Sequence, residues 1–308
     1  MLISFIMPAY KSEFLREALE SIVSQTSHDW ELVVVDDASP NNLRPIVEEY
    51  CIKYPNVRYY RNEKNIGGTD LVAQWNHSIA YAEGDWIVLA ADDDVYAADF
   101  CYEVSRLIEK YPNIDLVRAR VLQIDEKGKP LFDDGNPSEY TDKKDFLRDW
   151  LVAKIFTCVG NYAFRRKSLI ENGGFIEYPC AFCSDVATPI ALSRNGVAHT
   201  KEILFSFRHS SVHLSGDNTR MAEKIDAANK LYRWLSSLDY IQNDRSVDDV
   251  LCKEYIHDKC IYDYFNQAIR FSPLGQLFQL IGRCDLASPF EKGLLLLRWL
   301  KNAFHVEL

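Results

Sequence analysis

Residues 3–36, ISFIMPAYKSEFLREALESIVSQTSHDWELVVVD, decide the fold because they contain a strand, a helix and a second strand in succession. The runs 3–7 and 31–36 are apolar and rich in β-branched residues, as expected for strands that are covered on both faces. Residues 12–26 predict the helix, with Ser12 as its N-cap. Its apolar residues recur at helical spacing: Phe14, Leu15, Ala18, Leu19, Ile22 and Val23. A helix that joins two such strands is typical of a parallel α/β sheet.

The alternation continues along the first half of the chain. It predicts strands at 57–61 and 86–90 and helices at 43–54 and 68–84. These elements complete a doubly wound, mostly parallel α/β sheet. The pattern weakens after about residue 115, with further strands expected at 116–125 and 202–209 and helices at 142–153 and 184–196. Only helical patterns follow, so we expect a catalytic domain at 1–216 and an α-helical region at 217–308.

The composition limits the function. The 308 residues carry 35 Lys and Arg against 45 Asp and Glu, a net charge of −10, which argues against a nucleic-acid-binding surface. No apolar run is long enough to span a membrane, and the N-terminus lacks a signal peptide, so we expect a cytoplasmic protein. Of the eight cysteines, Cys180 and Cys183 form the only close pair. A zinc ribbon needs two such pairs, so reduced cysteines are the better interpretation.

Polar residues gather where the predicted strands end. Parallel sheets bind ligands at the carboxyl ends of their strands, so these residues should share one rim. They are Tyr10, Asp36, Asp37, Asp92, Asp93 and Asp94. Three adjacent carboxylates repel one another unless a cation offsets the charge. The triplet therefore suggests a divalent metal ion, Mn²⁺ or Mg²⁺, together with a phosphorylated ligand.

An ordered series of motifs resembles the family 2 glycosyltransferases, which have a GT-A fold. The series runs ISFIMPAYKSEFLREALESIVSQT, WELVVVDDASPNN, NEKNIGG, AEGDWIVLAADDDVY, ENGGF, CSDVATPIALSRNG and FSFRHSSVHLSG. It covers roughly residues 1–215. The resemblance implies an inverting, non-processive, metal-dependent transfer of a sugar from a nucleotide-sugar.

The resemblance assigns the nucleotide to the ends of the first two strands. The residues in question are Pro8, Ala9, Tyr10, Asp37 and, from NEKNIGG, Gly67. A carboxylate can accept from the ring N–H of uracil and Tyr10 can stack on the base, so uridine is expected over guanosine. The alternative for Asp37 is a turn or Asx cap before Pro40, which Asp36 could equally supply.

By position in the same family, Asp92 should contact the ribose and Asp93 the metal. The commoner family pattern is Asp-x-Asp-Asp, and Ala91 stands at its first position. The spacing of Asp92 and Asp94 restores the pattern in another frame, which makes Asp94 a second candidate metal ligand. The structural alternative is three solvated acids that cap the following helix.

The remaining candidate residues come from the later half of the chain. Asp185 matches the family's catalytic base, although the usual Glu-Asp pair is Ser184-Asp185 here. A plain N-cap is the competing interpretation of Asp185. Arg208 could face the diphosphate, and His209 or, with less support, His213 could complete the metal shell.

Other functions fit the sequence less well. A haloacid-dehalogenase-type phosphatase would have Thr where Tyr96 stands, and a dehydrogenase would have Gly-x-Gly-x-x-Gly after the first strand. A processive synthase would carry membrane spans and Gln-x-x-Arg-Trp. A catalytically silent sugar-nucleotide-binding protein on the same fold remains an alternative.

The acceptor is expected to be a saccharide or a lipid-linked molecule of a bacterial cell envelope. Residues 290–304, FEKGLLLLRWLKNAF, could lie on an anionic membrane at its inner face. They could equally pack against the catalytic domain or a second subunit, and a homodimer is compatible with the sequence.

Overall fold

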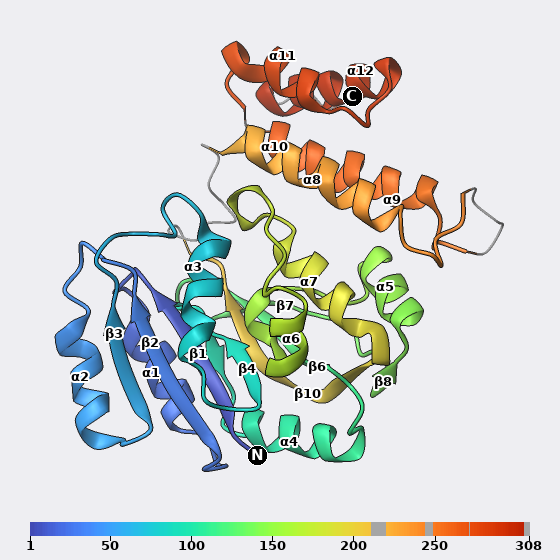
Figure 1. Ribbon diagram of the computed structural model, residues 1–308. Coiled ribbons are helices and arrows are strands. Elements are labelled where there is room, and N and C mark those ends of the chain that lie inside the picture. Colours follow the sequence, from blue (N-terminus) through green and yellow to red (C-terminus); the bar gives the residue numbers. More distant parts are fainter. Residues whose placement is uncertain (211–219, 244–248, 271, 305–308) are drawn as a thin grey trace. The chain divides into compact units, whose positions relative to one another are not determined.

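The computed structural model describes residues 1–210, 220–243, 249–270 and 272–304, and its central feature is a ten-stranded sheet (Figure 1). The strands are β1 (Ile3–Ala9), β2 (Trp30–Asp36), β3 (Val57–Arg61), β4 (Trp86–Leu89), β5 (Val95–Tyr96), β6 (Leu116–Ile124), β7 (Pro130–Asp133), β8 (Tyr140–Thr141), β9 (Tyr162–Arg165) and β10 (Val197–Arg208). Their order is β3-β2-β1-β4-β9-β6-β10-β5, with β7 paired to β6 and β8 to β10.

The sheet is mostly parallel, as the sequence predicts. β1 lies between β2 and β4 and is parallel to both, with Ile3 opposite Trp30 and Trp86. β2 pairs in parallel with β3, and β6 pairs in parallel with β10, whereas β9 is antiparallel to β4 and β6. The strand order turns back between β1 and β4, and the carboxyl ends of strands at such a point form the usual ligand site of an open α/β sheet.

Helices lie between the strands and, from Met221 onward, after the last strand. They are α1 (Leu15–Val23), α2 (Arg44–Lys53), α3 (Leu71–Ser78), α4 (Phe100–Lys110), α5 (Lys143–Leu151), α6 (Arg166–Glu171), α7 (Ser184–Leu192), α8 (Met221–Leu235), α9 (Lys253–Lys259), α10 (Asn266–Ile269), α11 (Leu274–Arg283) and α12 (Pro289–Phe304). A π-helical turn, Cys260–Phe265, joins α9 to α10.

The start of α1 differs from the sequence prediction. Ser12 is not its N-cap: the cap residue is Phe14, and no side chain caps the helix. The predicted apolar spacing is nevertheless correct, because Leu15, Leu19 and Ile22 are fully buried. Packing of this face therefore holds the helix without help from a cap.

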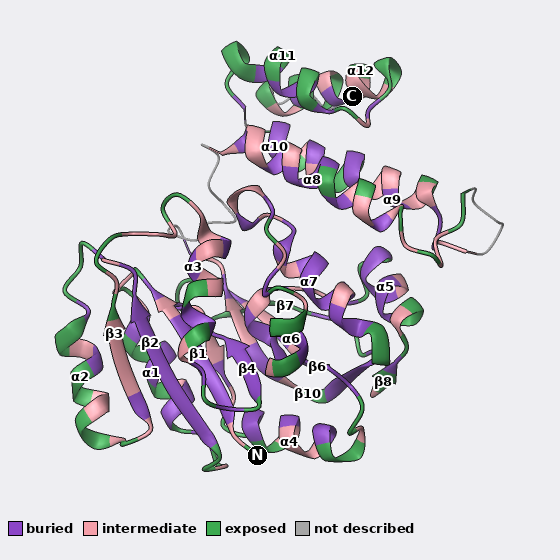
Figure 2. Cartoon of the chain, viewed as in Figure 1, coloured by how far each residue is buried: buried purple, intermediate pink, exposed green. Residues whose placement is uncertain are grey.

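The core lies on both faces of the parallel strands (Figure 2). Phe5 in β1, Leu19 in α1 and Phe100 in α4 belong to one hydrophobic cluster. Val33 and Ile87, which alternate with the side chains of that face, are also fully buried. The parallel strands are therefore apolar on both faces, as expected for a sheet that helices cover on both sides.

The chain divides into two compact units. One comprises Met1–Glu177 and Ser184–Ser211, and the other comprises Tyr178–Cys183 with Val212–Leu308. In the described part of the second unit the regular elements are helices, which share a hydrophobic cluster that includes Phe265 and Trp299. The domain boundary expected at residue 216 lies outside the described residues and stays a prediction. Among the described helices, none has the length and apolar character needed to cross a membrane.

Candidate functional site

The ends of β1, β2 and β4 meet at one rim of the sheet. The backbone N–H groups of Tyr10 and Lys11 donate to Asp92 Oδ2 across 2.8 and 2.7 Å. The N–H of Asp37 donates to the carbonyl of Ala9 across 2.9 Å. Hydrogen bonds thus bring together residues that are as much as 82 positions apart.

The acidic triplet Asp92–Asp94 is buried, with each residue at most 6% exposed. Burial raises the pKa of Asp92, Lys11 opposes that rise, and Asp93 adds to it. Burial also raises the pKa of Asp94 well above its usual range, and the charge of Asp93 adds to the effect. The triplet is therefore not the solvated helix cap of the structural alternative, since its charges stand in an environment that disfavours them.

Two cations lie beside the triplet, and the first, Lys11, offsets part of its charge. Its ammonium lies 3.3 Å from Asp92 Oδ1 and forms an ion pair with Asp93 Oδ2. Burial lowers the pKa of Lys11, but the charges of Asp92 and Asp93 outweigh it, so the pKa is raised. No sequence motif singles out Lys11, although it directly follows Tyr10 at the predicted strand end.

The second cation is Arg208, which is 1% exposed. Its backbone N–H donates to Asp94 Oδ1 across 2.9 Å, and its Nε donates to the carbonyl of Asp93 across 2.8 Å. Its Nη1 donates to the carbonyl of Glu126 across 3.1 Å, and its Nη2 lies 2.8 Å from Glu17 Oε1. These contacts favour a bracing role for Arg208 over the predicted contact with a diphosphate.

Asp36 and Asp37 have different partners. Asp36 Oδ1 accepts from the N–H of Ser39, so the side chain of Asp36 closes the turn before Pro40. Asp37 Oδ1 accepts from Asn62 Nδ2 across 2.8 Å and from the N–H of Ile66 across 2.9 Å. The carboxylate of Asp37 therefore holds the loop that follows β3.

Gly67 completes this loop. Its N–H donates to Asp37 Oδ2 across 2.7 Å, and a Cβ at this position would lie only 3.0 Å from the same oxygen. The glycine thus permits the close approach. Pro8 and Ala9 lie within β1, and Tyr10 stands beyond its end with its side chain 42% exposed. Of the predicted nucleotide contacts, Tyr10 is the residue whose side chain is open at the rim.

His209 follows Arg208 at the end of β10. Its Nε2 lies 2.8 Å from Gln123 Oε1, an acceptor, so Nε2 is assigned the proton and Nδ1 the lone pair. His213 lies outside the described residues. Carboxylate oxygens are the ligands that Mg²⁺ and Mn²⁺ prefer, so the donor set of the triplet fits such an ion.

Asp185 occupies the first turn of α7. Burial raises its pKa to about 7, although the backbone N–H groups of Asp185 and Val186 oppose the rise. The residue as a whole is partly exposed. A carboxyl group with a pKa near neutral pH is suited to proton transfer.

The buried thiol of Cys158 is affected by the charges of both Asp94 and Asp185. Burial raises the pKa of this thiol well above its usual range, and the charges of Asp94 and Asp185 both add to the effect. The same two carboxylates therefore lie within electrostatic reach of one buried side chain.

Comparison with known proteins identifies the family. The family model described as Glycosyl transferase family 2 matches residues 4–174, which include β1 to β4 and the acidic triplet. The chain belongs to glycosyl transferase family 2. This membership sets the phosphatase and dehydrogenase interpretations aside.

Curated proteins with similar sequences match only part of the chain. A poly(ribitol-phosphate) beta-glucosyltransferase of Bacillus spizizenii (strain ATCC 23059 / NRRL B-14472 / W23) is 31% identical over 177 residues, 56% of this chain and 26% of that protein. The chain spans less than half the length of the curated relatives it matches.

Solved structures share the fold. The crystal structure of S. aureus TarS 1-349 in complex with UDP-GlcNAc has a TM-score of 0.73 at 18% identity, covering 98% of this chain and 88% of that chain. The mannosyltransferase PcManGT from Pyrobaculum calidifontis, in complex with GDP-Man and Mn²⁺, has a TM-score of 0.54 at 18% identity, covering 99% and 88%. The GT-A fold expected from the sequence is confirmed.

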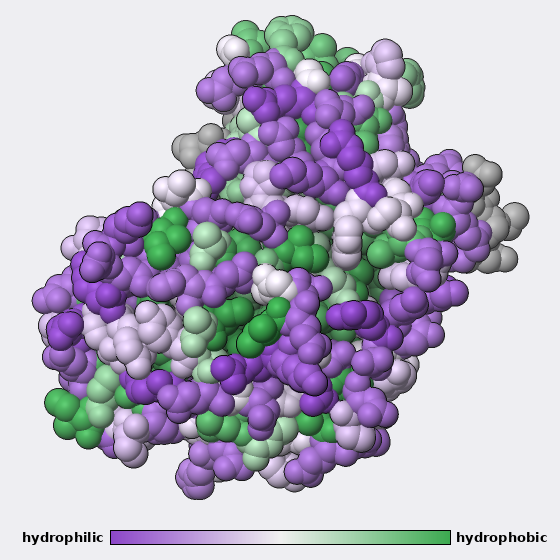
Figure 3. All heavy atoms as spheres, in the orientation of Figure 1, coloured by the Kyte–Doolittle hydropathy of each residue, from purple (hydrophilic) through white to green (hydrophobic). Residues whose placement is uncertain are grey.

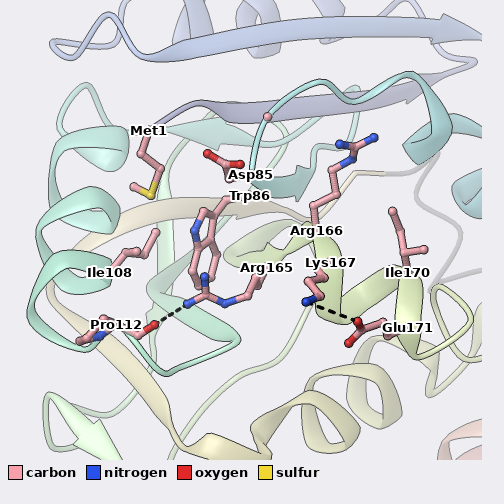
Figure 4. A pocket seen from close by; sticks show the side chains of 11 residues that line it. Met1, Asp85, Trp86, Ile108, Pro112, Arg165, Arg166, Lys167, Ile170 and Glu171 are labelled. Carbon is pink, nitrogen blue, oxygen red and sulfur yellow. Dashed lines mark hydrogen bonds and ion pairs between the residues drawn. The ribbon is translucent and has the colours of Figure 1, made fainter.

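The chain also has a pocket of about 750 Å³ at the opposite edge of the sheet, near the amino ends of β1 and β4 (Figure 4). Arg165 lies over the Trp86 ring there, with its Cζ 4.7 Å from the ring centroid. Its guanidinium donates to the carbonyls of Pro112 and Ile114. Since this cation is used to hold the fold, we place the candidate site at the acidic rim and not in this pocket.

Proposed function

We propose that the glycosyltransferase transfers a sugar from a UDP-sugar to an acceptor hydroxyl, with inversion and one sugar at a time. The observation that carries this proposal is the buried acidic triplet at the carboxyl ends of the parallel strands, together with the pKa of about 7 of Asp185 in the same compact unit. In such a site, the triplet can bind the metal ion that accompanies the leaving diphosphate. A separate carboxylate, Asp185, can accept the proton of the acceptor hydroxyl.

The proposed reaction is a single displacement. The acceptor oxygen forms a bond to the anomeric carbon as the bond from that carbon to the diphosphate oxygen breaks. The acceptor proton passes to the carboxylate of Asp185, and the electron pair of the broken bond leaves with the diphosphate. Attack from the face opposite the leaving group inverts the configuration.

A divalent cation, Mn²⁺ or Mg²⁺, would neutralise the charge that develops on the diphosphate. Asp93 and Asp94 would hold it, with His209 as a further candidate ligand, and Asp92 would accept from the ribose. In the described part of the chain, the triplet does not form a group of three close ligand atoms, whereas His257, Asp258 and Glu291 do. A site with few protein ligands suits an ion that keeps diphosphate oxygens and waters in its shell.

The choice of UDP is supported by the neighbour with UDP-GlcNAc bound and by the exposed ring of Tyr10 at the rim. The related poly(ribitol-phosphate) beta-glucosyltransferase supports an acceptor in the bacterial cell envelope. We therefore place the acceptor among envelope saccharides, polyols and their lipid-linked forms.

The helices α11 and α12 support peripheral contact with a membrane. They expose large apolar side chains, and Figure 3 shows hydrophobic residues gathered over this end of the helical unit. The exposed apolar residues are Leu274, Phe278, Phe290, Leu297 and Leu300. Co-sedimentation with anionic vesicles should fall in Phe278→Asp, and equal binding of the variant and wild type would refute this contact.

The proposed reaction is tested by incubating the purified chain with a panel of nucleotide-sugars, Mn²⁺ and envelope glycan acceptors. We expect transfer from a UDP-sugar, with a β-linked product by NMR from an α-linked donor. Donor binding without transfer or hydrolysis would favour a silent sugar-nucleotide-binding protein. Retention of configuration would refute the single displacement.

A further inference from the structure

Backbone hydrogen bonds to Asp92 position Lys11 next to the acidic triplet. The N–H groups of Tyr10 and Lys11 both donate to Asp92 Oδ2, which leaves Asp92 Oδ1 facing the ammonium at 3.3 Å. The Lys11 side chain is 24% exposed, whereas those of Asp92 and Asp93 are 6% and 8% exposed. The lysine thus covers carboxylates that are otherwise enclosed by protein.

The two cations of the triplet are not equivalent. The guanidinium of Arg208 is fully buried and donates to the carbonyls of Asp93 and Glu126, so it cannot leave without breaking the local fold. Lys11 pairs with carboxylate oxygens through a flexible stem of four carbons. Of these two cations, Lys11 is the one that can move.

A divalent cation held by Asp93 and Asp94 would compete with Lys11 for the carboxylate of Asp93. A metal ion and an ammonium repel each other, and both cannot pair with Asp93 Oδ2 at once. The diphosphate of a donor would bring two or more negative charges to the rim, which gives a displaced ammonium a new partner.

We propose that Lys11 is the built-in counter-ion of the acidic triplet and is exchanged for the divalent cation when the nucleotide diphosphate binds. The inference rests on the metal role in the proposed function. The exchange makes metal binding weak without nucleotide, because the metal ion must displace the Lys11 ammonium. Metal binding is stronger with nucleotide, because the displaced ammonium can pair with the diphosphate.

Calorimetric titration of Mn²⁺ into wild type, Lys11→Met and Lys167→Met tests the exchange. Lys167 is 82% exposed on α6, at the opposite edge of the sheet, so its variant removes the same charge away from the rim. Without nucleotide, Lys11→Met should bind Mn²⁺ about tenfold or more tightly than wild type, since one neighbouring like charge is lost. Lys167→Met should match wild type. Added UDP should tighten Mn²⁺ binding in wild type more than in Lys11→Met.

Thermal unfolding gives a second readout that needs no activity. In chelator, Lys11→Met should unfold at a lower temperature than wild type, and Mn²⁺ should raise its midpoint more than that of wild type. Lys11→Gln serves where the Met variant does not fold. If wild type binds Mn²⁺ and the Lys11 variants bind it equally or more weakly, the exchange is refuted while the metal role in the proposed function stands. Failure of every protein to bind Mn²⁺ with UDP overturns the metal role as well.

Discussion

The backbone N–H of Arg208 donates to Asp94 Oδ1 across 2.9 Å, and this bond joins the end of β10 to the loop that follows β4. The residues are 114 positions apart in the chain. The side chain of Arg208 strengthens the junction through the carbonyls of Asp93 and Glu126. The geometry of the triplet therefore depends on a buried arginine as well as on its own loop.

Replacement of Arg208 by Met should lower the free energy of unfolding by about 2–4 kcal/mol, because two buried carbonyls lose a charged donor. Denaturant titration measures the change. Arg16→Met is the matched control, since it removes an exposed guanidinium that pairs with Glu49, and it should have little effect. A loss of less than about 0.5 kcal/mol in Arg208→Met, the range of ordinary surface substitutions, would contradict the bracing role.

Asp37→Ala should weaken the binding of UDP by about 1.5–3 kcal/mol, the range for hydrogen bonds to a charged group, because the loop at Ile66 and Gly67 loses the charged acceptor that holds it. The carboxylate of Asp37 accepts hydrogen bonds from Ile66 and Gly67, so its loss frees the loop beside the proposed site of the nucleobase. Calorimetry measures the affinity, with Glu63→Ala as an exposed control in the same loop. Equal UDP affinity in Asp37→Ala and wild type would remove Asp37 and its loop from nucleotide binding.

Asp93→Ala should abolish transfer with little change in the unfolding midpoint, because the proposed metal loses a direct ligand. A strong chelator should stop the wild-type reaction, and added Mn²⁺ should restore it. Initial rates with and without chelator check the prediction. Full activity in excess chelator would show that the reaction needs no divalent cation.

Asp185→Asn should stabilise the protein more at pH 8 than at pH 5. Burial raises the folded-state pKa to about 7, whereas the unfolded value is about 4, so the folded protein binds this proton more tightly. The stability that protonated Asp185 contributes is present below pH of about 4 and is lost as pH rises through about 7. Thermal unfolding of both proteins at the two pH values provides the test. If the unfolding midpoints of Asp185→Asn and wild type differ by the same amount at pH 5 and pH 8, the raised pKa of Asp185 is contradicted.

The parallel core could be predicted from the sequence because local patterns carry it. The β-branched run at 31–36 and the helical spacing of Leu15, Leu19 and Ile22 each depend on near neighbours in the chain. The start of α1 could not, because Ser12 has the residue type of a cap whereas the helix begins after Phe14, which has no side-chain acceptor.

The candidate site divides in the same way. The sequence predicts that the triplet and Tyr10 lie at one rim, because both follow strand ends and the carboxyl ends of parallel strands share one edge of the sheet. The pairing of Lys11 with Asp93 and the burial of Arg208 arise from contacts between distant segments, and no spacing in the sequence reports them. Likewise, Asp37 could be assigned to a loop only once Ile66 and Gly67 were seen against its carboxylate.

The pH dependence of transfer follows from the role of Asp185 as base. Only its ionised form can accept the acceptor proton, so the rate should rise as pH increases through about 7. A profile of kcat/KM against pH in wild type measures this midpoint. A rate that falls across the same interval would indicate that the essential group must be protonated.

The most direct test of the account is the transfer rate of Asp185→Asn, measured beside its affinity for the donor. Asn keeps the size of the side chain and most of its hydrogen bonding but cannot act as a base. The account predicts unchanged calorimetric affinity for the UDP-sugar and a loss of transfer of about two to four orders of magnitude, the usual contribution of a positioned base. A nearly normal transfer rate in Asp185→Asn, with the donor bound as in wild type, would contradict it.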